Sequence, residues 1–532
     1  MAKNNKGLFH EWVPKPVQLL LVVLGLIPIL VVNGVYTRNI TFMVAGTQGM
    51  SSHFLMAYFA VSIGMYAIYA MGMRLKMFFR SKELVIGSLL LLALLSAVCG
   101  STDSPGLFVL SSLFIGIAKY LALIEFLLPL VFLISPQLRR EDAYPIIYPV
   151  VMVISMICSY FFVEIAETFN WENVYGIMVV VFLAEALIMT VFMHNKRAVK
   201  KHPLYQFHWI SLLQFIVILM VLNYVLCMAQ FHGWFSSPII VHLSVLILVQ
   251  SSIFLYNQSV LKRPYLELRE LKRKNVYASI LMSSGLGLFL ACGLIQAIFL
   301  KNILGYSSKI YALIYSCIIP GIIIGGVFSF KWFKNGRKLK ILILTGFCAL
   351  ILSNLIYYFL FNSIVDIWYF VLPMILKGGG IVILYAAIGV YNYRGLTGNK
   401  GYSPGTLYMT TRSFIGVAVF MAILSWAFYK LQLQNLSDLA GEMDLTESFA
   451  WTGRSPLGLY KGVLTQATLL AAKQIYGYTV IAGLVILVFV ATHRFETISA
   501  KDHVMRKKRL TAKTNSKFRQ KMGALEALIT GL

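Results

Sequence analysis

The chain has 532 residues, of which 59% are hydrophobic and only 12% are charged, and its mean hydropathy is +0.78. Soluble proteins carry about a quarter charged residues, so this composition excludes a soluble globular protein and predicts an integral membrane protein. The formal net charge is +26. The distribution of the basic residues, described below, argues against a nucleic-acid partner.

Apolar stretches follow one another along the whole chain. A membrane-spanning helix needs roughly 20 apolar residues. By that measure the sequence predicts 14 spans, which begin near residues 17, 53, 83, 106, 143, 174, 208, 237, 277, 309, 339, 365, 408 and 472. The predicted fold class is therefore an all-α polytopic membrane protein.

The loops between these spans alternate in charge. Residues 101–104 (STDS) contain no Lys or Arg, whereas residues 194–201 (HNKRAVKK) are strongly basic. Because cytoplasmic loops retain Lys and Arg, the alternation predicts an orientation, and an even number of spans places both basic termini in the cytoplasm. The expected location is the plasma (inner) membrane, where the excess positive charge also matches anionic lipid.

The predicted spans divide the chain into four parts. We expect a six-helix half over residues 1–202, two inserted helices (seven and eight) over residues 203–260, and a second six-helix half over residues 261–493. A long external loop is expected over residues 431–471, and a basic cytoplasmic tail over residues 494–532. The tail can also be read as an RNA or partner contact, but a solvated, lipid-facing tail explains the same residues.

Motifs for several kinds of chemistry are missing from the sequence. No GxxxxGK[ST] phosphate loop, HExxH or GxSxG motif is present, which argues against ATP hydrolysis and against an enzyme. The six cysteines lie in or beside apolar spans without metal spacing. We therefore expect no cofactor and no metal, and an energy source in an ion gradient.

Charged residues inside the spans are rare. Because a charge within a membrane helix costs about 2.5–3.5 kcal/mol on insertion scales, such residues are functional candidates by default. The two acids are Glu125 and Glu185, and the three bases are Lys119, Lys377 and Arg412. Six residues separate Lys119 from Glu125, which places them about 120° apart on a helix, so we do not expect them to pair.

Each of these residues has a functional and a structural interpretation. Glu125 is the leading protonation site, with Lys119 or Lys377 tuning it or binding an anionic group, or else it belongs to a structural ion pair. For Glu185 the structural interpretation is favoured. Arg412 can reach the cytoplasmic headgroups by snorkelling. Arg38, at the outer end of the first span, either guards the outer vestibule or contacts headgroups.

Short motifs along the chain resemble the major facilitator superfamily, specifically its 14-helix drug:proton antiporter branch (EmrB/QacA type). Residues 39–46 (NITFMVAG) are similar to its NVAxPxIAG stretch, and residues 72–82 (GMRLKMFFRSK) to its basic gating loop, which implies gating roles for Gly72, Arg74, Lys76 and Arg80. Residues 264–268 (PYLEL) with 274–275 (KN), 305–307 (GYS) and 411–416 (TRSFIG) match its C-terminal motifs in order.

The N-terminal motifs are degenerate. The family's acid in helix one falls on Gly34, its helix-four arginine falls near Ser112, and residues 153–158 (VISMIC) replace its glycine-rich motif in helix five. These are the positions that the family uses for proton coupling. Arg412 is the charged motif residue that carries over.

The resemblance implies two six-helix halves plus two inserted helices, and alternating access to a site near the bilayer midplane. The function expected from it is proton-coupled efflux of amphipathic small molecules, with protons and membrane lipids as further partners. A host with two membranes would add a periplasmic adaptor and an outer-membrane channel. Export of a specific endogenous lipid or siderophore-like product is one alternative, and a non-transporting membrane scaffold or sensor is another.

Overall fold

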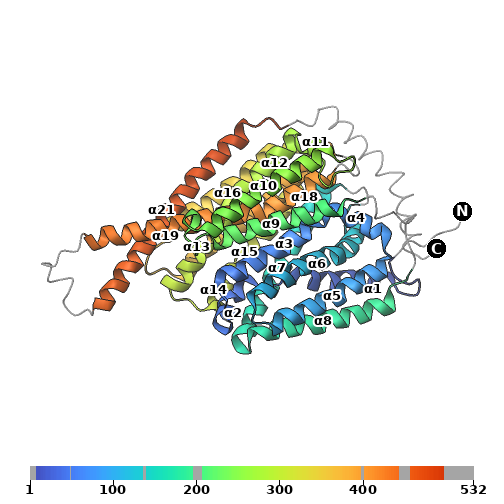
Figure 1. Cartoon of the computed structure of the whole chain (residues 1–532), viewed down its shortest axis with the longest axis horizontal. Coiled ribbons are helices and arrows are strands. Elements are labelled where there is room, and N and C mark those ends of the chain that lie inside the picture. The colour runs from blue at the N-terminus through green and yellow to red at the C-terminus, as the bar shows by residue number, and fades with distance from the viewer. Residues whose placement is uncertain are drawn as a thin grey trace.

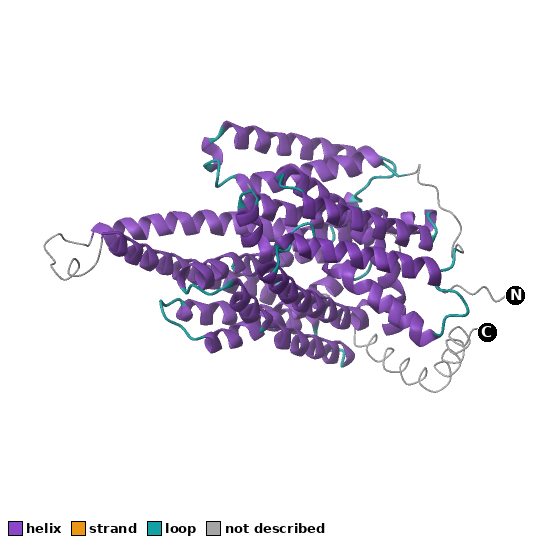
Figure 2. Ribbon diagram, turned by 90° about the horizontal axis from the view of Figure 1, so that it is seen from below, coloured by secondary structure: helices purple, strands orange, loops and turns teal. Residues whose placement is uncertain are grey.

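Helices make up the structured part of the chain. The computed structural model describes residues 8–47, 49–135, 139–195, 207–396, 401–441 and 456–495. Within these ranges it contains no β-strand, only an isolated bridge between Phe9 and Met193. The long helices run side by side in one elongated bundle (Figure 2). The predicted all-α polytopic fold is confirmed.

The apolar helices set the number of possible membrane crossings. Twelve of the described helical segments are long and apolar enough to cross a membrane. The pair α3 (Ser51–Ala67) and α4 (Tyr69–Phe78) meets the same criterion only when taken together, and the two helices are bent by 57° at their junction. The first apolar helix, α1 (Lys15–Val31), has only 17 residues. By length and composition the described residues therefore support 12 or 13 crossings, and the count of 14 is not confirmed.

The N-terminal half is built from the elements up to α8. After α1 come η1 (Thr37–Asn39), α2 (Ile40–Gly46), α3, α4, α5 (Ser81–Ser101), α6 (Pro105–Ile134), α7 (Arg140–Thr168) and α8 (Trp171–Phe192). Pro105 begins α6 at a position where a helix needs no backbone N–H. Buried apolar side chains from all of its long helices, including Phe162 and Ala166 of α7, make up most of one continuous core.

Glycines allow α3 and α6 to touch through their backbones. A Cβ on Gly64 would lie 2.1 Å from the carbonyl oxygen of Leu113, and a Cβ on Gly116 would lie 2.1 Å from that of Val61. The two glycines therefore face each other's helix reciprocally. Small residues at such crossings are a common means of helix association in membranes, where lipid competes with apolar packing.

Two helices lie between the halves in sequence and beside them in space. The first, α9 (Trp209–Met228), packs on α3, where the Asn223 side-chain amide donates to the carbonyl of Met56 at 2.8 Å. The second, α10 (Pro238–Val260), follows η2 (Trp234–Ser236) and packs mainly on α9. Only Ile240, Phe254 and Gln258 of α10 are buried, so most of its surface is available to lipid.

In the C-terminal half, glycines again allow two helices to touch through their backbones. Its elements are α11 (Leu268–Leu271), α12 (Lys274–Ala291), α13 (Gly293–Ile298), η3 (Phe299–Ile303), α14 (Ser308–Ser316), α15 (Ile318–Lys334), α16 (Leu339–Leu360), η4 (Ile367–Phe370), α17 (Val371–Asn392), α18 (Tyr402–Thr410), η6 (Thr411–Ile415), α19 (Gly416–Gly441) and α21 (Pro456–Thr492). A Cβ on Gly321 would lie 1.9 Å from the carbonyl oxygen of Ile375, and one on Gly378 would lie 2.4 Å from that of Ile318. These glycines bring α15 and α17 together.

The predicted external loop over residues 431–471 is largely helical. In the described part of this segment, α19 continues to Gly441 and α21 begins at Pro456, and the two helices project together beyond the bundle (Figure 1). Gln432 donates to Thr468 at 2.8 Å, and Asn435 donates to Gln474 at 3.1 Å. Leucines at helical spacing in residues 431–439 favour this extension. The acidic residues Glu442, Asp444 and Glu447 lie outside the described residues, as does most of the basic tail.

The two halves meet along the length of the bundle. Helix α7 packs against α14, α15 and α17, and α3 and α4 pack against α18 and η6. We call the end that carries α4, α11 and α18 the inner end, after the predicted topology, and the end that carries α2, α13 and α14 the outer end (Figure 1). Of the charged residues singled out above, Arg38, Lys377 and Arg412 lie at this junction, whereas Glu125, Lys119 and Glu185 are buried inside the N-terminal half.

Candidate functional site

Glu125 forms an ion pair inside the N-terminal half. Its Oε2 lies 3.0 Å from Nζ of Lys76, and the Glu125 side chain is 1% exposed against 19% for Lys76. Its second oxygen, Oε1, has no hydrogen-bond partner within the described residues. The pair joins α6 to α4, so the charge on this carboxylate bears directly on how α4 is held.

The residues assigned to a gating loop lie mostly in a helix. Gly72, Arg74 and Lys76 are part of α4, and Arg80 is the residue before α5, where it pairs with Glu83 at 3.7 Å. A loop prediction for this segment was wrong, because residues 69–78 continue the apolar periodicity of α3 after a bend. Arg74 lies 6.0 Å from the ring of Phe207.

Tyr120 of α6, the helix that also carries Glu125, packs against α4. A Cβ on Gly72 would lie 2.2 Å from the Tyr120 ring, so only glycine permits this contact. The rings of Tyr69 and Tyr120 lie 5.8 Å apart. Helix α6 therefore contacts α4 at two positions: Tyr120 packs against Tyr69 and Gly72, and Glu125 pairs with Lys76.

Lys119 donates hydrogen bonds to the end of α1. Its Nζ donates to the carbonyl oxygens of Leu30 at 3.0 Å and Val32 at 2.8 Å, and to Oδ1 of Asn33 at 3.4 Å. These groups lie at the C-terminal end of α1, where carbonyls lack helical partners and the helix dipole favours a cation. Lys119 thus caps α1, and as predicted it does not pair with Glu125.

Glu185 is buried against α1. It is 6% exposed, and neither carboxylate oxygen has a hydrogen-bond partner within the described residues. A Cβ on Gly25 would lie 2.8 Å from its Oε1, so the glycine makes room for the acid. An ionised carboxylate without donors is costly to bury, which makes Glu185 a second candidate for proton uptake.

Arg38 and Lys377 approach the same aromatic ring from different halves. The guanidinium carbon of Arg38 lies 4.5 Å from the centre of the Tyr315 ring, and Nζ of Lys377 lies 6.0 Å from it. Lys377 also donates to Oε1 of Gln296 at 2.8 Å, and Arg38 reaches Sδ of Met156 at 3.1 Å. Both cations are buried, so Arg38 does not extend to the headgroups.

Arg412 lies among tyrosines. Its guanidinium carbon is 4.4 Å from the ring centre of Tyr385, 5.1 Å from Tyr148 and 5.6 Å from Tyr408. The side chain is 7% exposed, so the snorkelling interpretation is wrong. Each cation–π contact stabilises a desolvated cation by about 2 kcal/mol. Burying an ion costs several kcal/mol, so the three rings together can offset the burial of Arg412. Tyr148 belongs to α7, so this contact also crosses between the halves.

Which tyrosines line the junction is the part of the site that sequence reasoning missed. Tyr144 and Tyr148 on α7, and Tyr311 and Tyr315 on α14, are each four residues apart and so share a helix face. That spacing was available in the sequence. Which of the 29 tyrosines face the other half depends on packing between distant helices, which no local pattern specifies.

Polar contacts close the inner end of the junction. The hydroxyls of Tyr69 (α4) and Tyr393 (after α17) lie 2.8 Å apart, and the guanidinium carbon of Arg140 lies 3.6 Å from the centre of the Tyr393 ring. Gly405 makes room for both tyrosines, since a Cβ there would lie 2.4 Å from the Tyr393 hydroxyl. Tyr69 and Arg140 belong to the N-terminal half, and Tyr393 belongs to the C-terminal half.

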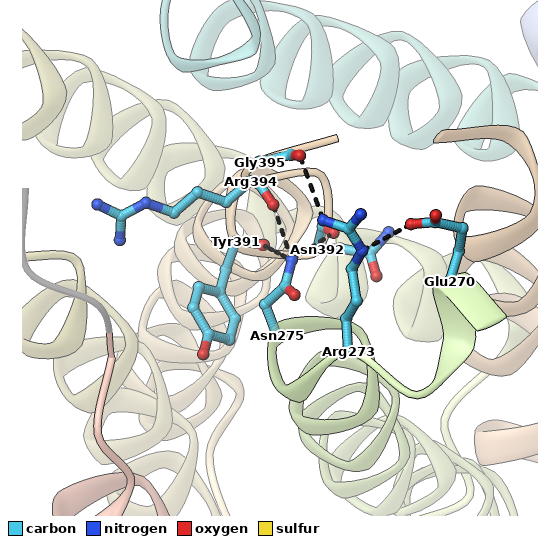
Figure 3. Close-up of polar contacts among 7 residues, drawn as sticks. All are labelled: Glu270, Arg273, Asn275, Tyr391, Asn392, Arg394 and Gly395. Carbon is cyan, nitrogen blue, oxygen red and sulfur yellow. Dashed lines mark hydrogen bonds and ion pairs between the residues drawn. The ribbon is translucent and has the colours of Figure 1, made fainter. Parts of the chain in front are cut away.

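The start of α12 fastens the end of α17 close to this contact. The side-chain amide of Asn275 donates to the carbonyl oxygens of Tyr391, Asn392 and Arg394 at 3.3, 3.1 and 3.0 Å (Figure 3). Arg273 reaches the carbonyl of Gly395 at 3.3 Å (Figure 3). Asn275 thus satisfies carbonyls that a helix end leaves open. This gives a physical role to the KN motif of residues 274–275.

A histidine lies on the other side of the α17 end. Nε2 of His493 is 2.9 Å from the hydroxyl of Tyr391. Burial and the nearby ammonium groups of Lys340 and Lys274 lower the pKa of His493. The imidazole is therefore neutral at pH 7, and its Nε2 can accept a hydrogen bond from the Tyr391 hydroxyl.

The outer end is closed by a different set of residues. Nζ of Lys301 donates to Oγ1 of Thr41 at 3.1 Å, and Nζ of Lys309 lies 2.6 Å from Glu164. Both contacts join an N-terminal element (α2 or α7) to the C-terminal half. Both are exposed, so each contributes little to stability.

The described residues contain no group of His, Cys, Asp and Glu arranged to hold a metal ion.

Comparison with known proteins gives a result for structure and none for sequence. The sequence matches no family model and no curated protein. Among solved structures, a peptide transporter POT in a mutant form has a TM-score of 0.57 at 14% identity, covering 90% of this chain and 94% of its own. A POT family transporter in complex with 5-aminolevulinic acid has a TM-score of 0.57 at 13% identity, covering 90% and 96%.

A third structure, peptide transporter POT in complex with alafosfalin, has a TM-score of 0.56 at 13% identity, covering 90% of this chain and 94% of its own. Likeness at this level of identity shows the fold. The expected 14-helix drug:proton antiporter branch is not confirmed, because the similar structures named here are of the POT type. The chain has the two-half, major-facilitator fold of these transporters.

Proposed function

We propose that this protein is a secondary active transporter that works by alternating access. The support is the arrangement of the junction: two helical halves meet through separable polar contacts at each end, with buried cations and tyrosines between them. Opening the Tyr69–Tyr393 contact would expose the middle of the junction to one side of the membrane. Opening the contacts of Lys301 and Lys309 would expose it to the other. The fold shared with the POT structures is consistent with this scheme.

Proton coupling is assigned to Glu125. A proton on this carboxylate would remove the charge that attracts Lys76, and the ammonium would then lose its partner in α4. The ion pair is therefore a two-state element, present or absent with one proton. Buried carboxylates of this kind are the usual proton carriers in transporters.

The coupling reaches the inner end through α4. Lys76 and Tyr69 belong to the same short helix, and the break at Ile68 separates that helix from α3. Loss of the Lys76–Glu125 pair leaves α4 held on α6 by the packing of Tyr120, without an ion pair. We expect α4 to move about the bend and to separate Tyr69 from Tyr393. Proton binding would thus open the inner end.

The cargo proposed from the sequence is an amphipathic small molecule moved outward. Aromatic side chains line the junction between the halves, which suits a cargo with an apolar body. A small peptide is the second candidate, because the solved relatives are named as peptide transporters. The single observation that carries the transport proposal is the ion pair of Glu125 with Lys76 of α4. This short helix is bent away from α3, and its Tyr69 also makes the contact with Tyr393 that closes the inner end.

Transport can be tested in proteoliposomes with an imposed proton gradient. The probes are carboxyfluorescein (an anionic dye), rhodamine 6G (a cationic dye with the same ring system) and a fluorescently labelled dipeptide. We expect gradient-driven movement of at least one probe above protein-free vesicles, and its loss in Glu125→Gln. The matched control is Glu83→Gln, because Glu83 forms only an exposed pair with Arg80.

Each result decides between the alternatives. Movement of no probe by the wild-type protein would refute transport and favour a scaffold. Full gradient-driven transport in Glu125→Gln would refute the coupling assignment, and Glu185→Gln, assayed in parallel, then tests whether the second buried acid carries the proton.

A further inference from the structure

Three buried cations at the junction have no counter-charge. Arg38, Lys377 and Arg412 are 7%, 2% and 7% exposed. Within the described residues, no ion pair joins any of them to a carboxylate. The two acids buried in the N-terminal half are occupied elsewhere, since Glu125 pairs with Lys76 and Glu185 faces α1. The junction therefore carries a net positive charge.

The same residues have unused hydrogen-bond donors. Nη1 of Arg38, and Nε and Nη1 of Arg412, are buried without a partner within the described residues, as is Nε2 of Gln296 beside Lys377. The face of a tyrosine ring attracts a cation but accepts no strong hydrogen bond, so the surrounding rings do not satisfy these groups. Buried donors normally have acceptors. What is missing at this junction is an acceptor that carries negative charge.

The cations occupy two levels along the bundle. Arg38 and Lys377 meet at Tyr315, and Arg412 meets Tyr385. Lys377 and Tyr385 are eight residues apart on α17, which corresponds to about 12 Å along the helix axis. An elongated molecule of small-drug size would reach both levels.

Half-buried tyrosines connect the two levels. Tyr58 and Tyr66 from α3, and Tyr148, Tyr315 and Tyr385 from the helices opposite, are each only partly buried although they lie between the halves. The rings of Tyr148 and Tyr385 are 5.7 Å apart, and the Tyr66 hydroxyl accepts from Ser413 at 3.2 Å. Partial exposure at a junction indicates space beside these rings that protein atoms do not fill.

From these observations we propose that the junction binds an amphipathic organic anion. Its acidic groups (carboxylate, sulfonate or phosphate) would take the donors of Arg38 and Lys377 at one level and of Arg412 at the other. Its apolar body would lie against the tyrosines between them. This proposal rests on the proposed transport function for its biological meaning, but it is a statement about binding and can be tested without a gradient.

A cationic or zwitterionic cargo fits this junction less well. A free ammonium group would need an acceptor of negative charge, and the described part of the junction offers tyrosine hydroxyls and amide oxygens instead. It would also be repelled by Arg38, Lys377 and Arg412. The charge pattern thus separates this chain from a carrier that selects lipophilic cations.

The test is equilibrium binding to the purified full-length protein in detergent, followed by fluorescence anisotropy. Carboxyfluorescein and rhodamine 6G are compared, with empty micelles as the blank for each dye. The two dyes share a ring system, but rhodamine 6G is the more apolar one, so tighter binding of carboxyfluorescein would be due to its negative charge and not to stacking. We expect saturable binding of carboxyfluorescein and an affinity for rhodamine 6G at least tenfold weaker.

Variants then assign the site. Arg412→Gln and Lys377→Gln are each expected to weaken carboxyfluorescein binding about tenfold or more, since each removes a charge-assisted donor. Lys377→Arg keeps the charge and is expected to retain more affinity than Lys377→Gln. The matched control is Lys331→Gln, because Lys331 is an exposed lysine at the end of α15. Elution as a single species shows that each variant is folded.

The outcomes separate this proposal from the transport proposal. Absence of carboxyfluorescein binding to the wild-type protein, preference for rhodamine 6G, or unchanged binding in both glutamine variants would overturn it. Transport of the cationic dye or the dipeptide alone in proteoliposomes would leave the transporter proposal standing and refute the anion site. Anion binding without any transport would support the site and refute the transporter.

Discussion

In the N-terminal half, two lysine ammonium groups have partners of their own: buried Lys119 caps the end of α1, and partly buried Lys76 pairs with Glu125. In the C-terminal half, Arg412 lies among tyrosine rings and Lys377 beside an amide oxygen, and neither meets a carboxylate within the described residues. The two halves share their helix packing but not their electrostatics. The difference indicates a division of labour, with the coupling proton on the first half and most of the cargo charge on the second.

The comparison predicts that Lys119 serves stability and not cargo. Lys119→Met keeps the length of the side chain but leaves the carbonyls of Leu30 and Val32 without a donor. We expect a loss of about 2–4 kcal/mol of stability, measured as a lower midpoint of thermal unfolding in detergent. Carboxyfluorescein affinity per folded molecule is expected to stay at the wild-type value. A Lys119→Met protein that unfolds normally but no longer binds the anion would show that the division between halves is wrong.

The shared packing predicts equal sensitivity to added methyl groups in both halves. Gly64→Ala and Gly321→Ala each place a Cβ about 2 Å from a carbonyl oxygen of the neighbouring helix. We expect each to lower stability by about 1–3 kcal/mol. Gly87→Ala and Gly176→Ala are the controls, since a Cβ at either position meets nothing within 4 Å. Similar midpoints for all four variants would contradict the close-contact account.

The smallest predicted effect concerns the inner closure. Tyr69→Phe and Tyr393→Phe remove the same hydrogen bond, which contributes about 1 kcal/mol, so each is expected to shift the equilibrium toward the inward-open form about fivefold. The double variant should match the single ones, because the bond is already lost. Accessibility of a cysteine introduced at the inner end reports the shift. Additive effects in the double variant would show that the two hydroxyls act separately.

Much of the fold followed from patterning, because hydropathy and alternating charge act over 20-residue windows and do not depend on tertiary contacts. The buried residues Glu125, Glu185, Lys119, Lys377 and Arg412 could be identified for the same reason: a charge within an apolar span is visible in the sequence. Their partners could not. The pairing of Glu125 with Lys76, 49 residues away, and of Lys119 with the end of α1 depends on how α6 packs between α1 and α4.

Two errors have local causes. Residues 72–78 read as a loop because they are basic, yet they continue a helix beyond the bend at Ile68. The segment after residue 431 read as a loop because it is polar enough for water, although its leucine spacing favours the helix that the structure shows. The tyrosine lining was missed because a tyrosine facing lipid and one facing the other half have the same local sequence pattern.

The most direct test of the divided roles compares two rates in the same proteoliposomes. One is the gradient-driven accumulation of carboxyfluorescein, and the other is its exchange at equal concentrations without a gradient. We predict that Glu125→Gln abolishes accumulation but keeps exchange, because cargo binding in the C-terminal half is intact. Arg412→Gln is predicted to reduce both rates together. Loss of exchange in Glu125→Gln, or accumulation at the wild-type rate, would contradict the assignment of the proton to one half and of most of the cargo charge to the other.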